Sequence, residues 1–233
     1  DSDFNGILTA VTLDANMYYG CTDSDALNYD DNANVDDGSC VYTVTQDVTL
    51  DPFKYNLVSF SNEALDPSIG SVLAGADILI TANDDGAFYA PSYGVDQLGE
   101  LGLEGYKVFV AGGESQTVSC EGVPYDVGAT SLTINPFKYN LVPYLPSDCI
   151  STEDVFGGID EEILIARNDD GDFYAPSYGV MTLTEMCPGE AYAVFSSSAY
   201  DLEFTYPSDG LARSDDSDNV KKWNAYNEAS LAS

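Results

Sequence analysis

The sequence contains no histidine, and only seven of its 233 residues are Lys or Arg. Without His there is no Ser/His or Cys/His nucleophile, no imidazole zinc site and no usual general base at neutral pH. A phosphate-binding loop of the G-x-x-x-x-G-K type is absent too. We therefore expect a protein that is not an enzyme and that holds no organic cofactor.

One catalytic route stays open, because a pair of carboxylates can hydrolyse a glycoside and the chain has forty Asp and Glu. Abundance of carboxylates is not evidence of their arrangement. Two small repeated modules, described below, also leave little room for a deep cleft. A glycosidase is therefore the third of three functional hypotheses.

Seven basic against forty acidic residues give a formal charge of −33, spread along the whole sequence. Such a chain repels nucleic acid and anionic membrane surfaces, and it suits salty water and divalent cations. No stretch approaches the roughly 20 apolar residues of a membrane span. Because 17 Tyr, 10 Phe and regular β-branched runs accompany the charge, the composition predicts a folded protein with an acidic surface, and a marine setting.

The chain opens with neither an initiator Met nor a signal peptide, so we expect a processed chain or a piece of a longer one. Residues 4–19 alternate in polarity and predict a strand. Residues 20–40 are polar and are bounded by Cys21 and Cys40. A disulfide closing this loop of about 20 residues would remove roughly 3 kcal/mol of unfolded-state entropy, and it would place the chain in an oxidising compartment.

Oxygen-bearing side chains recur between these two cysteines, often two residues apart. Calcium needs six to eight hard oxygen ligands, so this pattern predicts a calcium-binding loop, although the Glu that closes an EF-hand is missing. The alternative is a solvated acidic loop. The candidate ligands are Asp23, Asp25, Asn28, Asp30, Asn32, Asn34, Asp36 and Asp37.

The segment GCTDSDALNYDDNANVDDGSC resembles a short module that recurs in secreted multi-module proteins of marine bacteria and in virion proteins of marine tailed phages. The resemblance implies an extracellular spacer or adhesive context and no reaction. The sequence departs from the module at Ser24 and Asp31, where Pro is common. The matching residues are Gly20, Cys21, Thr22, Asp23, Ala26, Asn28, Tyr29, Asn32, Ala33, Asp36, Asp37, Gly38, Ser39 and Cys40.

An internal repeat organises the rest of the chain. TLDPFKYNLV at 49–58 returns as TINPFKYNLV at 133–142, and DILITANDDGAFYAPSYGV at 77–95 returns as EILIARNDDGDFYAPSYGV at 162–180. The copies also resemble a module of the same surface proteins that begins near YNLV and closes with a Leu...PG..Y run. Leu183, Pro188, Gly189 and Tyr192 fit that ending, whereas the first copy has Leu98, Leu103, Gly105 and Tyr106 without the Pro.

Each copy predicts the same order of elements. A strand at YNLV is followed by a short helix at 67–75 or 151–159, and by a hairpin that joins ILITA or ILIAR to FYAP around NDDG. A second helical turn at 95–101 or 180–186 and a last strand at 105–111 or 191–197 complete the copy. The fold class is therefore mainly β with short helices, as two tandem pseudo-repeats of a small β-rich module after a small disulfide-closed acidic loop.

Three features of the copies have both a structural and a functional interpretation. The NDDG turns are explained by hairpin closure, and Lys54 and Lys138 by ion pairs with a neighbouring Asp. The FYAPSYG segments can present rings to a sugar or protein, although core packing beneath a turn also explains them. The candidate ligand contacts there are Tyr89, Tyr93, Tyr174 and Tyr178.

Cys149 and Cys187 both occur only in the second copy, so we predict that they pair with each other. Cys120 is then left over, either buried and free or cross-linked to another chain. The predicted organisation is an N-terminal strand segment (1–19), the acidic loop (20–42), repeat 1 (43–125), repeat 2 (126–206), and a linker with a docking segment around Trp223 (207–233).

These observations favour a non-enzymatic extracellular structural or adhesive protein of a cell-surface fibre or virion surface. Calcium and disulfides would stiffen it, and other protein subunits would be its partners. The alternative is a calcium-dependent, lectin-like module that binds glycans. We expect no nucleic acid partner and no membrane insertion.

Overall fold

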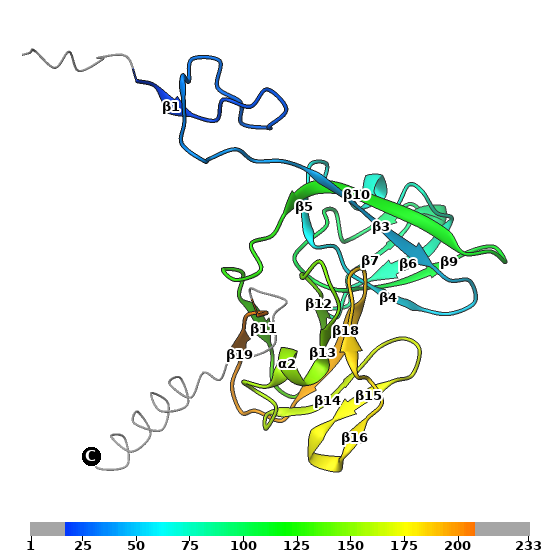
Figure 1. Cartoon of the computed structure of the whole chain (residues 1–233). Helices are drawn as coiled ribbons and strands as arrows, with labels where there is room; N and C mark the ends of the chain where they lie inside the picture. The colour runs from blue at the N-terminus through cyan, green and yellow to red at the C-terminus, as the bar shows by residue number, and fades with distance from the viewer. Residues whose placement is uncertain (1–16, 208–233) are drawn as a thin grey trace, which may run out of the picture. The chain divides into compact units, whose positions relative to one another are not determined.

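The computed structural model describes residues 17–207 and is mainly β, as predicted (Figure 1). The chain divides into two compact units, residues 1–43 and 44–233. The predicted strand at 4–19 lies outside the described residues as far as residue 16. The predicted docking segment around Trp223 lies outside them entirely.

The first unit has almost no core. Strand β1 (Tyr19–Gly20) pairs in parallel with β2 (Val35–Asp36), and only Cys21 and Ala26 are buried among its described residues. The predicted disulfide between Cys21 and Cys40 is confirmed. This covalent bond closes a loop that packing alone would not hold together.

The first repeat consists of two sheets around one core. In one sheet, β10 (Gln116–Pro124) lies between β3 (Val44–Leu50) and β5 (Asn62–Ala64). The other sheet has the order β4 (Asn56–Val58), β9 (Tyr106–Val110), β6 (Ile78–Ala82), β7 (Phe88–Ala90) and β8 (Val95–Asp96). Helix α1 (Ile69–Val72) buries Ile69 and Val72 in the core between them.

The second repeat builds a five-stranded sheet with the same strand order. It runs β12 (Tyr139–Pro143), β18 (Ala191–Ser196), β14 (Ile163–Arg167), β15 (Phe173–Ala175) and β16 (Val180–Met181). Two short pairs accompany it, β11 (Leu132–Ile134) with β19 (Leu202–Phe204) and β13 (Ile150–Ser151) with β17 (Glu185–Met186). Helix α2 (Thr152–Phe156) is capped by the Ser151 hydroxyl, which accepts from the Asp154 amide.

The cysteines of the two repeats lie as the repeat comparison predicts. Cys149 and Cys187 form a disulfide in the second repeat. Cys120 is free and is buried in the core of the first repeat, which favours the first of its two predicted fates. Burial raises the pKa of its thiol, so the reactive thiolate is disfavoured.

The second helical turn predicted in each copy is wrong. The turn lies earlier, as the 3₁₀ segments Pro91–Tyr93 and Pro176–Tyr178, and the following residues Val95–Asp96 and Val180–Met181 form edge strands. Gly94 and Gly179 end the turns at φ values of 65° and 67°, a conformation that costs glycine little. Pairing with the neighbouring strand outweighs the helical pattern of the next residues.

The two repeats meet through the faces of their five-stranded sheets that point away from the two cores. Leu57 and Leu141 form a small buried cluster with Ala191 and Ala193. Polar groups join it, since the Ser59 hydroxyl donates to the Glu190 carbonyl and accepts from the Tyr144 amide. The Gly105 amide donates to the Leu141 carbonyl at 2.8 Å.

The close approach at Gly105 gives a direct test of this junction. A Cβ at Gly105 would lie 2.6 Å from the Ala191 Cβ and 3.0 Å from the Leu141 carbonyl oxygen, whereas one at Gly102 in the same loop has nothing nearer than 3.5 Å. We expect Gly105→Ala to lower the free energy of unfolding by about 1–3 kcal/mol. Gly102→Ala should change it by less than about 0.5 kcal/mol. Equal urea midpoints for the two variants would contradict the described junction.

Candidate functional site

The oxygen-rich side chains of the disulfide loop are used mainly as local turn caps. A carboxylate oxygen accepts the backbone amide two residues further on at Asp23, Asp30, Asp36 and Asp37. Such Asx turns stabilise bends without any metal. These bonds depress the pKa of Asp23 and Asp30 below its ordinary value. The pKa of Asp37 is lowered mainly by a hydrogen bond from the Ser39 side chain and further by the Ser39 amide.

The two ends of the loop are joined by amide side chains. Asn28 accepts from the Val41 amide at 2.8 Å and donates to the Ser39 carbonyl at 2.6 Å. The Asn34 side-chain oxygen accepts from the Tyr18 amide at 3.0 Å. The Tyr42 hydroxyl donates to the second carboxylate oxygen of Asp23 at 2.7 Å. These polar contacts stabilise the loop in place of an apolar core.

The predicted calcium ligands are therefore dispersed and partly engaged. Within residues 17–207, no three His, Cys, Asp or Glu side chains converge as a group that could hold a metal ion. Asp25 and Asn32 are exposed, and Asp30 and Asp36 each have one carboxylate oxygen that accepts no hydrogen bond within the described residues. Calcium would have to draw these oxygens together.

The tyrosines of the two FYAPSYG segments separate into two kinds. Tyr93 and Tyr178 are 83% and 71% exposed. Tyr174 is only 3% exposed and stacks on Phe156, and Tyr89 packs against the core of the first repeat. Tyr174 is therefore wrong as a ligand contact, because strand β15 turns its ring inward. The exposed pair is still available to a partner.

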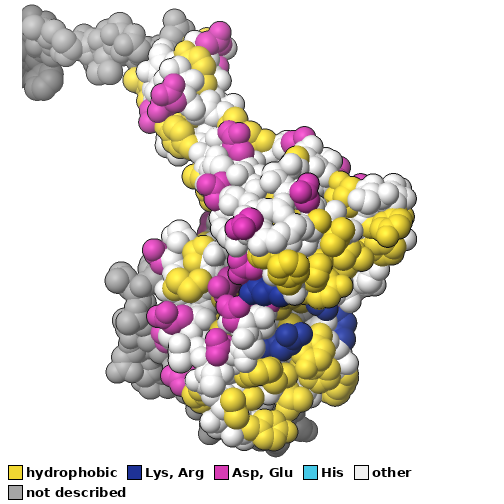
Figure 2. Space-filling view, turned by 90° about the vertical axis from the view of Figure 1, so that its right-hand side faces the viewer, with side chains coloured by type: hydrophobic (Ala, Val, Ile, Leu, Met, Phe, Trp, Pro, Cys, Tyr) yellow, Lys and Arg dark blue, Asp and Glu magenta, His cyan; other side chains and the backbone are white. Residues whose placement is uncertain are grey.

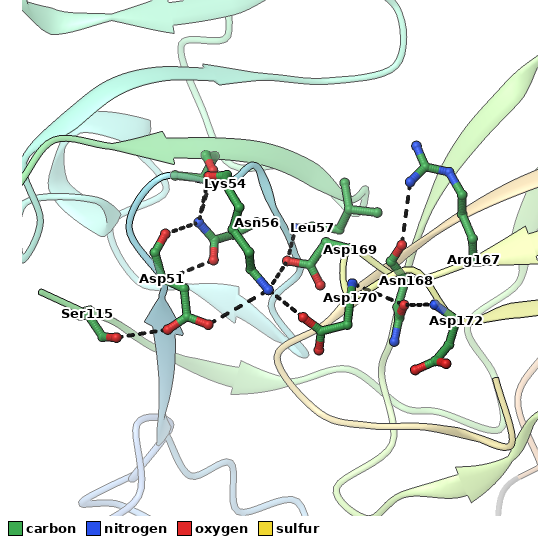
Figure 3. Close-up of polar contacts among 11 residues, drawn as sticks. Asp51, Lys54, Asn56, Leu57, Ser115, Arg167, Asn168, Asp169, Asp170 and Asp172 are labelled. Atoms are coloured by element: carbon green, nitrogen blue, oxygen red, sulfur yellow. Dashed lines mark hydrogen bonds and ion pairs between the residues drawn. The ribbon is translucent and has the colours of Figure 1, made fainter. Parts of the chain in front are cut away.

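The two NDDG turns do more than close their hairpins. Asn168 accepts the amides of Asp170 and Asp172, and Asn83 accepts the amide of Ala87, so each Asn shapes its own turn. The two Asp that follow project toward the other repeat, as Figure 3 shows for Asp169 and Asp170. The turn sequence thus serves both the hairpin and the junction.

Lys54 and Lys138 cross the junction reciprocally. The Lys54 ammonium lies 2.6 Å from Asp170 and 3.2 Å from Asp169, but 3.7 Å from its sequence neighbour Asp51 (Figure 3). The Lys138 ammonium lies 2.8 Å from Asp85 and 3.2 Å from Asp84. The sequence suggested an ion pair with a neighbouring Asp, and Lys54 does make one with Asp51, but this is its longest ion pair. The shorter ion pairs of Lys54 and those of Lys138 are with aspartates of the opposite repeat.

A polar cleft lies beside each lysine. The first, of about 320 Å³, is lined by Lys54, Asp51 and Asp47 of repeat 1 and by Asp169, Asp170 and Glu190 of repeat 2. The second, of about 130 Å³, contains Lys138, Asp84, Asp85 and Glu104. In the first cleft, repeat 1 supplies the lysine and repeat 2 supplies the turn aspartates and the glutamate. In the second cleft these contributions are reversed, so the junction is pseudo-symmetric.

Each cleft contains one half-buried glutamate. Desolvation raises the pKa of Glu190 and of Glu104, and the nearby Asp pairs of the turns raise it further. Hydrogen bonds from Tyr192 to Glu190 and from Asn83 to Glu104 oppose the shift. The junction therefore contains two carboxyl groups that favour the protonated form more than an exposed Glu does.

A third paired feature is an exposed phenylalanine in a strained conformation. Phe53 and Phe137 are the only non-glycine residues with positive φ in the described part of the chain, at 64° and 56°. They are 79% and 66% exposed. Such a conformation costs a bulky residue roughly 1 kcal/mol or more, and the exposed ring gains little from burial. The sequence contained a signal for this strain in the motif D/N-P-F-K-Y-N. Its Phe occupies a position of positive φ, which Asn or Gly would adopt more easily.

Further aromatic rings accompany each of these phenylalanines. Tyr55 packs edge-on against Phe109, and Tyr139 against Phe195, in both cases with ring centroids 5.2 Å apart. Residues opposite one another in an antiparallel pair share a face of the sheet. Leu57 is opposite Lys107, so Lys107 and Phe109 lie on the junction side of the first sheet.

The corresponding face of the second sheet has Arg167 in place of the lysine. Arg167 is opposite Ala193, which belongs to the buried cluster of the junction. All four basic residues within 17–207, namely Lys54, Lys107, Lys138 and Arg167, thus belong to the junction or to the sheet faces that form it. Figure 2 shows basic side chains gathered there with hydrophobic side chains above and below them.

We define the junction face as Phe53, Tyr55, Phe109, Phe137, Tyr139 and Phe195 together with these four basic residues. No protein family, no curated protein and no solved structure matches the chain.

The two glutamates give a pH test of the junction. A carboxyl whose pKa is raised in the folded state makes stability fall as the pH rises from its ordinary value of 4.5 through the raised value. We expect Glu190→Gln and Glu104→Gln to increase the free energy of unfolding at neutral pH. The increase should disappear at about pH 4, where the unfolded carboxyl is also largely protonated.

Urea unfolding at the two pH values would measure this difference, with the exposed Glu114→Gln as the control. A gain of the same size at both pH values would show that the effect does not come from titration of the two carboxyl groups.

Proposed function

We propose that this chain is a non-enzymatic extracellular protein with a structural and adhesive role on a cell-surface fibre or virion surface. The main support for this proposal is the reciprocal junction, which holds two similar modules together. Each module presents the same exposed aromatic motif. Duplication of a contact motif on a rigid body suits multivalent attachment.

The disulfides support this location. The described chain contains two of them, and disulfides persist mainly in oxidising compartments. The resemblance of residues 20–40 to modules of secreted and virion proteins points the same way.

Calcium is part of this proposal. The disulfide loop concentrates carboxylate and amide oxygens, the ligands that calcium prefers. The carboxylates of Asp30, Asp36 and Asp37 would supply negative charge, with Asp23, Asp25, Asn28, Asn32 and Asn34 as the other candidates. Binding would stiffen a unit that has almost no apolar core.

The calcium proposal has a thermodynamic test. A ligand that binds only the folded state raises stability by RT ln(1 + [L]/Kd), about 2.7 kcal/mol at a hundredfold excess over Kd. We expect calcium to slow proteolysis within residues 17–43 relative to EDTA, and Asp36→Asn with Asp37→Asn to abolish the difference. The acidic pair of the second repeat, Glu161→Gln with Asp160→Asn, is the control, of which Glu161 is exposed and Asp160 partly buried. Equal proteolysis in calcium and EDTA would contradict calcium binding.

The location has a separate test. Immunogold electron microscopy of the native source with an antibody against this chain should show label in a regular array on a fibre or particle. Sparse label on cells or in the medium would contradict a structural subunit and would favour a secreted binding protein.

A calcium-dependent, lectin-like module is the second candidate. The observation that favours it is the equivalent exposure of Tyr93 and Tyr178 at the two FYAPSYG turns. Exposed tyrosines offer a flat apolar ring and a hydroxyl group, which suits ligands with both apolar and polar groups.

A further inference from the structure

We propose that the junction face binds a neutral polysaccharide chain along both repeats, an inference that rests on the adhesive role proposed above. The rings in question are not those of the FYAPSYG turns. They belong to the PFKYN segments and to strands β9 and β18, on either side of the contact between the repeats.

Both phenylalanines of the face are held in a strained backbone conformation. Phe53 has its ring tip 3.8 Å from the position of a Cβ built on Gly113, so it rests on a loop with little to pack against. Neither the backbone conformation nor burial explains why this position holds Phe in both copies. Contact with a partner does explain it, because a ring held outward by the backbone is ready to receive a flat apolar surface.

Rings and charges alternate along each PFKYN segment. Lys54 separates Phe53 from Tyr55, and Lys138 separates Phe137 from Tyr139. Protein interfaces have cores depleted of charge, and of Lys in particular. A sugar chain instead presents apolar C–H faces that cover rings and hydroxyl groups that hydrogen-bond to Lys, Arg and carboxylates. Its chemistry fits interrupted rings better than a protein surface does.

The charge of the chain and the shape of the face limit which ligands fit. The chain has a net charge of −33, which opposes the approach of an anionic polymer. On the face itself, Lys54 and Lys138 are already paired with aspartates, so only Lys107 and Arg167 are left without a salt bridge in the described residues. The rings lie on open surface, whereas small-molecule sites bury most of their ligand. These properties favour an extended, uncharged ligand.

The pseudo-symmetry predicts how the affinity should fall as ring sets are removed. Two equivalent ring sets on one rigid body bind a long chain more tightly than either does alone, because the second contact is intramolecular. We expect loss of one ring set to weaken binding about tenfold and loss of both to weaken it more than a hundredfold.

The experiment is affinity electrophoresis of the full chain in native gels that contain hydroxyethylcellulose, laminarin or glucomannan as neutral probes, and alginate as an anionic probe. We expect at least one neutral probe to retard the protein. Phe53→Asn and Phe137→Asn should each weaken binding about tenfold, and the double variant should lose it. Asn tolerates positive φ, so these variants should keep or raise the thermal midpoint.

Two control variants define the surface. Leu65→Ser removes an exposed apolar side chain at the end of β5, and Tyr93→Ser with Tyr178→Ser removes the exposed rings of the FYAPSYG turns. Both should leave retardation unchanged. If the Asn variants fail to fold, Tyr55→Ser with Tyr139→Ser tests the same face through its exposed tyrosines.

Several results would overturn the proposal. These are retardation by alginate alone, no retardation by any neutral probe, unchanged retardation of the double variant, or loss only with Tyr93→Ser and Tyr178→Ser. Self-association in sedimentation that only the Phe variants abolish would instead identify a second copy as the occupant. A regular array in the gold labelling would uphold the structural role even if glycan binding failed.

Discussion

The contact between the two repeats is the constraint on which the rest of the large unit depends. Its ion pairs are the most visible part, yet the lysines are 31% and 36% exposed, and surface pairs contribute about 0–1 kcal/mol each. Burying Leu57 and Leu141 is worth roughly 1.5–3 kcal/mol for each side chain. The apolar cluster therefore supplies most of the stability of the contact, while the reciprocal lysines join the PFKYN segment of each repeat to the NDDG turn of the other.

The disulfide loop achieves order by different means. With only Cys21 and Ala26 buried, it has no apolar core to oppose the entropy of the unfolded chain. A covalent closure reduces that entropy, and side-chain oxygens of Asp and Asn satisfy the backbone amides that no sheet accepts. The same acidic residues that suggest a metal site are therefore already useful without one, and calcium would add to this order.

The junction also explains why features that each have a simple interpretation occur together. NDDG closes a hairpin, PFKYN leads into a strand, and a glutamate precedes the last strand of each five-stranded sheet. Only the tertiary structure brings these three segments, from opposite repeats, around one cleft. The cleft, and the strained phenylalanine that precedes its lysine in the sequence, recur in both repeats.

The sequence alone determined what depends on local patterning and on its own duplication. The hairpin strands Ile78–Ala82 and Ile163–Arg167, the last strands of the five-stranded sheets and both disulfides followed from alternation, turn residues and comparison of the copies. The tertiary structure decided the partner of Lys54, the inward rotation of Tyr174 and the edge strands in place of a predicted helical turn. Each of these depends on groups distant in sequence, whose competition local patterns do not encode.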